Sequence, residues 1–148
     1  MKTQRLSISD KKNGKCIPLI EILDSIKDGE QLNWQLLWLD VTPCPNDAEY
    51  IVKLQETINK SEDGLPISFG SLKNLGLKFF QEIDLTVIGF QLDENLRRYK
   101  EDKEMYEKCD VVIEMIDGGF WEVISQDETL LSNLQAKYKE VEMIDLIS

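Results

Sequence analysis

The 148-residue chain contains no histidine. Histidine is the commonest general base and the commonest zinc ligand, so its absence excludes Ser-His-Asp and Cys-His catalysis. The three cysteines, Cys16, Cys44 and Cys109, form no CxxC pair, which excludes a zinc ribbon and a thioredoxin-like motif. We expect three reduced thiols, and Cys44, between two prolines in a predicted loop, is the candidate for a regulatory one.

Glycine-rich phosphate-binding loops are also missing, because the eight glycines fit neither a P-loop nor GxGxxG. No serine stands in a GxSxG context, and no EF-hand spacing occurs. The longest apolar stretches, such as 36–39, have the length of a strand, and the N-terminus has no signal-peptide core. We therefore expect a cytoplasmic protein without catalytic residues, cofactor or membrane contact.

Positive charge is scarce: 17 basic residues face 28 acidic ones, and the formal net charge is −11. A nucleic-acid-binding protein normally carries a basic face, so this balance argues against one. The imbalance is uneven along the chain, since residues 1–15 are basic on balance and residues 109–148 are strongly acidic. A field of one sign speeds association with a surface of opposite sign, which points to a basic protein partner.

The remaining composition is that of a globular protein, with 42% hydrophobic residues, and we expect one domain over residues 1–148. Period-two patterns predict strands at 2–9, 32–41, 84–90, 111–116, 120–125 and 141–147, and helical spacing predicts helices at 18–27, 47–60, 71–83, 93–108 and 127–138. This order predicts an α+β fold, a single mixed sheet of about five to six strands with a C-terminal hairpin and helices packed on it.

The C-terminal hairpin is the clearest local signal in the sequence. Two β-rich runs, 111–116 and 120–125, are joined by Asp117-Gly118-Gly119, and such links supply the positive φ that tight hairpin turns require.

Tryptophans suggest two kinds of site. Trp34 and Trp38 share a strand face by period two, which favours either core packing or an aromatic-lined ligand pocket. Trp121 follows the hairpin turn, where we expect a partly exposed position suited to anchoring a partner.

Acidic residues on and beside the hairpin allow a third chemistry. Carboxylates alone suffice to bind magnesium, and the candidate ligands are Asp110, Glu114, Asp117 and Glu122. This alternative would make the protein a carboxylate-metal hydrolase.

The stretch VVIEMIDGGFWEVISQDE (111–128), followed by a short helix and an acidic end, resembles small acidic immunity proteins of bacterial polymorphic and contact-dependent toxin systems. That resemblance covers the last forty residues and implies a single acidic domain that binds a toxin domain and blocks it.

The leading prediction is thus a non-enzymatic binding protein, an immunity protein or antitoxin that occludes a basic toxin domain. The predicted partner-binding residues are Glu114, Asp117, Phe120, Trp121, Glu122, Asp127 and Glu128. A small-ligand or regulatory module with a pocket lined by Trp34 and Trp38 is the alternative.

Overall fold

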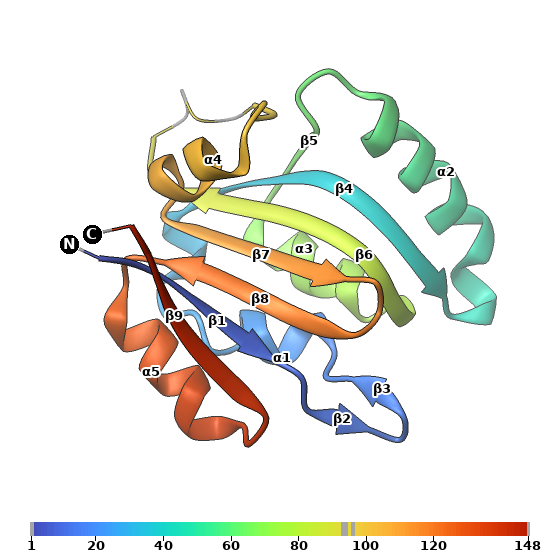
Figure 1. Ribbon diagram of the computed structural model, residues 1–148. Helices are drawn as coiled ribbons and strands as arrows, with labels where there is room; N and C mark the ends of the chain where they lie inside the picture. The colour runs from blue at the N-terminus through green and yellow to red at the C-terminus, as the bar shows by residue number, and fades with distance from the viewer. Residues whose placement is uncertain (1, 93–94, 96, 148) are drawn as a thin grey trace.

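A seven-stranded sheet forms the centre of the computed structural model, which describes residues 2–92, 95 and 97–147 (Figure 1). Its strand order is β5-β4-β6-β7-β8-β1-β9, and every neighbouring pair is antiparallel. The strands are β1 (Thr3–Ile8), β4 (Asn33–Pro43), β5 (Leu65–Ile67), β6 (Phe79–Phe90), β7 (Val111–Ile116), β8 (Phe120–Ser125) and β9 (Val141–Ile147). The short strands β2 (Lys11–Lys12) and β3 (Lys15–Cys16) form a separate hairpin.

The helices of the described residues are α1 (Leu19–Leu23), α2 (Ala48–Lys60), α3 (Phe69–Gly76), α4 (Asp102–Lys108) and α5 (Glu128–Lys137), with 3-10 turns η1 (Gly29–Gln31) and η2 (Pro45–Asp47). The predicted α+β fold is confirmed. Two details of the prediction differ: the sheet includes the three-residue strand β5, and its pairings are antiparallel throughout.

The sheet carries a large core on one face and a small one on the other. The large core joins alternate strand residues, among them Leu36, Val87 and Val123, to the helices α1, α2, α3 and α5. We call this side the core face. On the opposite side α4 covers one end of the sheet, where Met105 packs with Val112. The rest of that side carries no helix among the described residues, and we call it the open face.

The hairpin β7–β8 is confirmed at its predicted bounds. Asp117 and Gly118 both adopt positive φ, 49° and 64°, as a tight hairpin turn requires. The Gly118 amide donates a hydrogen bond to the carbonyl of Ile83 at 2.7 Å, so the turn is fixed against β6.

A β-bulge in β4 changes which residues share a face. Leu36 pairs with Val87 and Trp38 with Thr86, so Leu37 is an extra residue on its strand. Trp34 consequently lies in the core face at 2% exposure, whereas Trp38 lies on the open face at 44%. The prediction that the two tryptophans share a face is wrong, because simple alternation cannot anticipate the inserted residue.

Three predicted helices are shorter than expected. The helix predicted at 18–27 already ends at Leu23. The helix predicted at 71–83 ends at Gly76, because Phe79 already begins the long strand β6. In the segment predicted as helix at 93–108, positions 93, 94 and 96 lie outside the described residues, and helix α4 begins only at Asp102.

Arg98 explains part of the late start of α4. Its guanidinium donates to the backbone carbonyls of Leu37, Ile58 and Ser61, which ties this segment to β4 and to the end of α2. In the same segment, the Arg97 guanidinium forms an ion pair of 2.8 Å with the carboxylate of Glu104, seven residues further along the chain.

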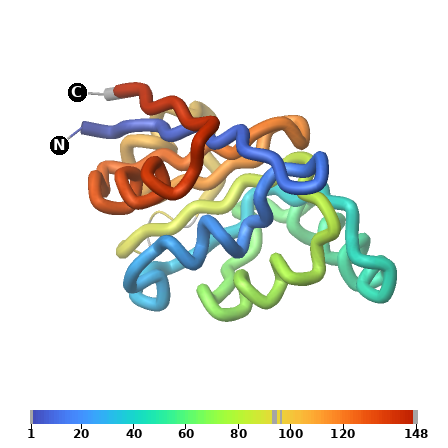
Figure 2. The backbone as a smooth tube through the Cα atoms, turned by 90° about the horizontal axis from the view of Figure 1, so that it is seen from below, coloured from blue at the N-terminus to red at the C-terminus, as the bar shows by residue number. Residues whose placement is uncertain are grey.

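The two ends of the described chain lie side by side, because β1 and β9 are antiparallel neighbours at one end of the sheet (Figure 2). Helix α5 packs beneath β8 through Leu130, Leu131 and Leu134. It begins at Glu128, and Asp127 caps it as predicted: the Asp127 carboxylate accepts hydrogen bonds from the amides of Thr129 and Leu130.

Candidate functional site

The open face carries a row of polar side chains that runs across six strands. The register places Trp38, Thr86, Glu114, Glu122, Ser7 and Glu142 next to one another in that order. Adjacent strands are about 4.8 Å apart, so the row spans roughly 24 Å. A second opposed pair, Asp40 and Asp84, adds two more carboxylates beside Trp38.

Glu114 and Glu122 form the centre of this row as a directly opposed pair of like charges. Burial is the main cause that raises the pKa of Glu114, and the nearby carboxylates of Asp102 and Glu122 raise it further. A hydrogen bond from the Tyr106 hydroxyl to Glu114 Oε1, 2.9 Å long, opposes that shift. Like charges directly opposite each other destabilise a sheet, so this pair contributes less to the stability of the fold than a neutral pair would.

Arg5 partly compensates the pair from the neighbouring strand β1. Its Nε lies 2.7 Å from Glu122 Oε2, as an ion pair that lacks hydrogen-bond alignment. The Arg5 side chain is 29% exposed and that of Glu122 is 14% exposed, so both are sheltered without being sealed from solvent. The row thus stays acidic towards Glu142, which is exposed on the edge strand β9.

Apolar side chains accompany the acidic ones on the open face. Trp38 is a large exposed hydrophobic residue at one end of the row. Ile116 and Phe120 form a half-buried pair across the hairpin beside Asp84. Exposed aromatic area next to polar groups is the composition of a protein-binding surface.

Trp121 does not lie on this surface, and the prediction of a partly exposed position is wrong. Its side chain is 0% exposed in the core face, and its indole N–H donates to the carbonyl of Ile17 at 2.7 Å. The reason is its pairing opposite Ile8 and Met115, both core residues, which orients the indole away from the open face.

The other predicted site residues fall into separate groups. Glu114, Glu122 and Phe120 share the open face, and Asp117 is exposed at the hairpin turn, where its amide donates to Asp84. Asp127 and Glu128 lie past the opposite end of β8. A six-residue strand is about 20 Å long, so the seven residues predicted as one site do not form one patch.

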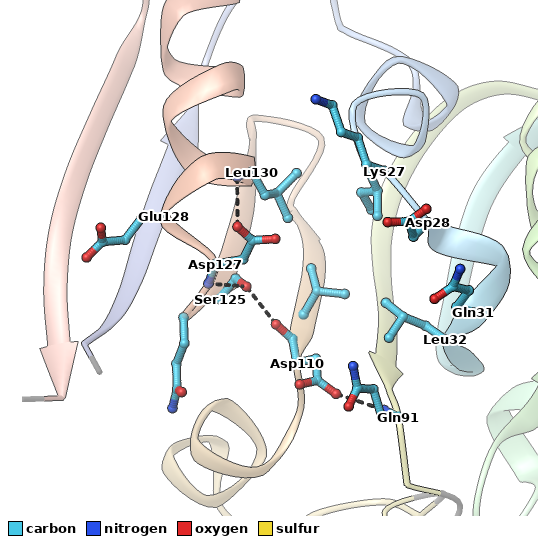
Figure 3. Close-up of a pocket in the computed structure, with 13 residues that line it drawn as sticks. Lys27, Asp28, Gln31, Leu32, Gln91, Asp110, Ser125, Asp127, Glu128 and Leu130 are labelled. Carbon is cyan, nitrogen blue, oxygen red and sulfur yellow. Dashed lines mark hydrogen bonds between the residues drawn. The ribbon is translucent and has the colours of Figure 1, made fainter.

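Asp127 and Glu128 line a cleft of about 670 Å³ at that opposite end of the sheet (Figure 3). Its walls come from the segment before η1, from the start of β7 and from the start of α5. Asp28 and Asp127 lie on opposite walls in the close-up, and Glu128 points away from the cleft (Figure 3).

The four candidate magnesium ligands do not come together. Asp110 precedes β7 and Asp117 follows it, so the whole strand separates them, and Glu114 and Glu122 are the two that are neighbours. Within residues 2–92, 95 and 97–147 no group of three or more acidic, cysteine or histidine side chains is arranged to hold a metal ion.

The cysteines occupy different environments. Burial raises the pKa of the Cys109 thiol to about 11, which makes it a poor nucleophile at neutral pH. Cys16 and Cys44 are half-buried and unbridged.

Comparison of the chain with protein-family models, with curated proteins and with solved structures finds no match. None of the helices in the described part of the chain combines the length and the apolar character that crossing a membrane requires.

Sequence reasoning missed Trp38, Asp40, Asp84 and Glu142 as members of the acidic surface. Glu142 joins the row only through the strand order, which places β9 beside β1 and β1 beside β8. For Trp38 the deciding feature is the bulge at Leu37, which leaves no clear mark in the sequence.

Proposed function

We propose that the protein is a non-enzymatic binding protein of the immunity type, which occludes the basic active surface of a toxin domain in the cytoplasm. The observation that supports this most is the acidic row on the open face, with Glu114 opposite Glu122 and Trp38 exposed at its end. A partner's basic groups would relieve the repulsion within the row when they bind.

Occlusion suits the form of this surface. A strip roughly 24 Å long across a sheet is comparable with one side of a protein–protein interface. Trp38 supplies the desolvated anchor that Trp121 was expected to provide, and the carboxylates steer the partner towards it.

The alternative of a ligand pocket lined by both Trp34 and Trp38 does not fit this sheet. Trp34 and Trp38 lie on opposite faces of the sheet and do not line a common cavity. Trp34 stacks on Phe69 in the core face, with ring centroids 5.4 Å apart.

A toxicity assay tests the proposal. The gene beside this chain's own is first identified, and the C-terminal domain of the protein that it encodes is then expressed in a bacterial host, with and without this chain. We expect the wild-type chain to restore growth and the folded triple variant Trp38→Ala, Asp40→Lys, Glu142→Lys to fail. A control with the same charge change, Glu56→Lys with Glu62→Lys, should protect as the wild type does.

Two outcomes would contradict the proposal. One is a neighbouring domain that is not toxic, or whose toxicity the wild-type chain leaves unchanged. The other is full protection by the triple variant, which would place the interface elsewhere on the molecule.

A further inference from the structure

The cleft at the end of the sheet is separate from the open face and has the size of a small-ligand site. Its volume of about 670 Å³ lies within the range typical of such sites. It opens where β7 begins and β8 ends, whereas the hairpin turn lies at the other end of both strands.

The floor of the cleft is apolar. Ile26, Leu32, Val111 and Leu130 line it, and three of these four side chains, those other than Leu32, also belong to the buried core. Because these residues are fixed by core packing, the floor is preformed rather than assembled on binding.

The walls are acidic and come from three separate elements. Asp28 precedes η1, Asp110 precedes β7 and Asp127 precedes α5. Lys27 is the cationic residue among the lining side chains. Two of the acidic side chains use only one carboxylate oxygen in these hydrogen bonds. Asp110 accepts the backbone N–H of Gln91 through Oδ2, and Asp127 accepts the backbone N–H groups of Thr129 and Leu130 through Oδ1.

The three carboxylates come from separate elements of the fold, and this placement distinguishes between kinds of cation. A metal ion requires ligands that converge on one point, and among the described residues no group of three or more acidic, cysteine or histidine side chains does so. Separated carboxylates above an apolar floor instead match a chain molecule whose positive groups are separated by methylenes. The methylenes would cover the floor while the ammonium groups meet different walls.

We propose that this cleft binds a linear polyamine, with its alkyl chain against Leu32, Val111 and Leu130 and its ammonium groups at Asp28, Asp110 and Asp127. The inference does not rest on the proposed function, because it concerns different residues and a small-molecule ligand.

Three aspartate-to-asparagine substitutions test the site with little effect on the fold. Asp28 has φ 59°, a region that asparagine tolerates well. Asparagine also caps helices, which suits Asp127, and its carbonyl can accept the Gln91 amide at position 110.

A matched control separates the site from general attraction to an acidic protein. The cleft variant Asp28→Asn, Asp110→Asn, Asp127→Asn removes three negative charges. The open-face variant Glu114→Gln, Glu122→Gln, Glu142→Gln removes the same number. Both are titrated with spermidine in buffer of physiological salt concentration, with amide chemical shifts followed by NMR and circular dichroism as the check of folding.

We expect saturable 1:1 binding to the wild type, with the largest shifts around Asp28, Val111 and Leu130. The cleft variant should bind at least about tenfold more weakly, and the open-face variant within about twofold of the wild type. 1,8-octanediol and magnesium chloride, which lack the amine groups or the alkyl chain, should not shift the same amides.

Several results would overturn the inference. Equal weakening in both variants would show attraction without a site, and no saturation at millimolar spermidine would show that no site exists. Tighter binding of a blocked Lys-Gly-Lys peptide than of spermidine would assign the cleft to a peptide segment instead.

Discussion

At the scale of single residues, the position of each tryptophan decides what it does. Trp121 is sealed in the core with its indole N–H bonded to Ile17, whereas Trp38 is exposed on the open face. The neighbouring residues of Trp121 led to the opposite expectation, because proximity to a turn says little about which face of a strand a side chain takes.

Matched substitutions test this assignment. Trp121→Phe removes the donor to the Ile17 carbonyl and leaves a void, so we expect the free energy of unfolding to fall by about 1–3 kcal/mol. Trp38→Phe should change it by less than about 0.5 kcal/mol. Urea denaturation measures both, and equal effects would contradict the assignment.

Glu114 gives a prediction for pH. Its pKa is raised above the ordinary 4.5, so the folded state is penalised as pH rises from 4.5 towards the folded pKa, and the penalty stays constant above it. We expect the stability of Glu114→Gln relative to the wild type to improve between about pH 4 and pH 7. Denaturation at both pH values measures it, with exposed Glu142→Gln as the control.

If the difference in the free energy of unfolding between Glu114→Gln and the wild type is the same at both pH values, the raised pKa of Glu114 is contradicted. An equal improvement in Glu142→Gln would contradict it as well, since that residue lies exposed at the edge of the sheet.

At the scale of helices and strands, local patterns predicted most elements. The hairpin β7–β8, strand β9 and the start of α5 lie where turn residues, alternation and a capping aspartate placed them. The helix predicted at 71–83 failed because Phe79 fits a helical stripe and a strand equally well. The end of α3 at Gly76 is set by long-range pairing of β6 with β4, which no local pattern reveals.

Two glycine-to-alanine substitutions test how the elements are built. Gly118 has φ 64°, so alanine there should cost about 1–2 kcal/mol although there is room for the methyl group. Gly70 lies in α3 with open space around it, so alanine should stabilise by roughly 0.5–1 kcal/mol. Thermal denaturation should show opposite signs, and a common sign would contradict the backbone assignment.

At the scale of the whole molecule, the strand order determines the candidate surface. The sequence indicated an acidic C-terminal region, and Glu114 and Glu122 are indeed neighbours because one hairpin carries both. Glu142, Asp40 and Asp84 join them only through pairings between distant segments. For the same reason the acidic pair at 127–128, close to β8 in sequence, lies at the other end of the sheet.

The central claim is that the open face captures a basic protein partner. The measurement that tests it most directly is the association rate constant with the proposed toxin partner, by stopped-flow fluorescence at several salt concentrations. Asp40→Lys with Glu142→Lys should slow association at least about tenfold at low salt and flatten its salt dependence, because steering by charge is lost. Glu56→Lys with Glu62→Lys should leave the rate within about twofold, because Glu56 lies on α2, which packs on the core face, and Glu62 lies in the loop between α2 and β5. Equal slowing by the two pairs would contradict the account, as would an unchanged rate in the open-face pair.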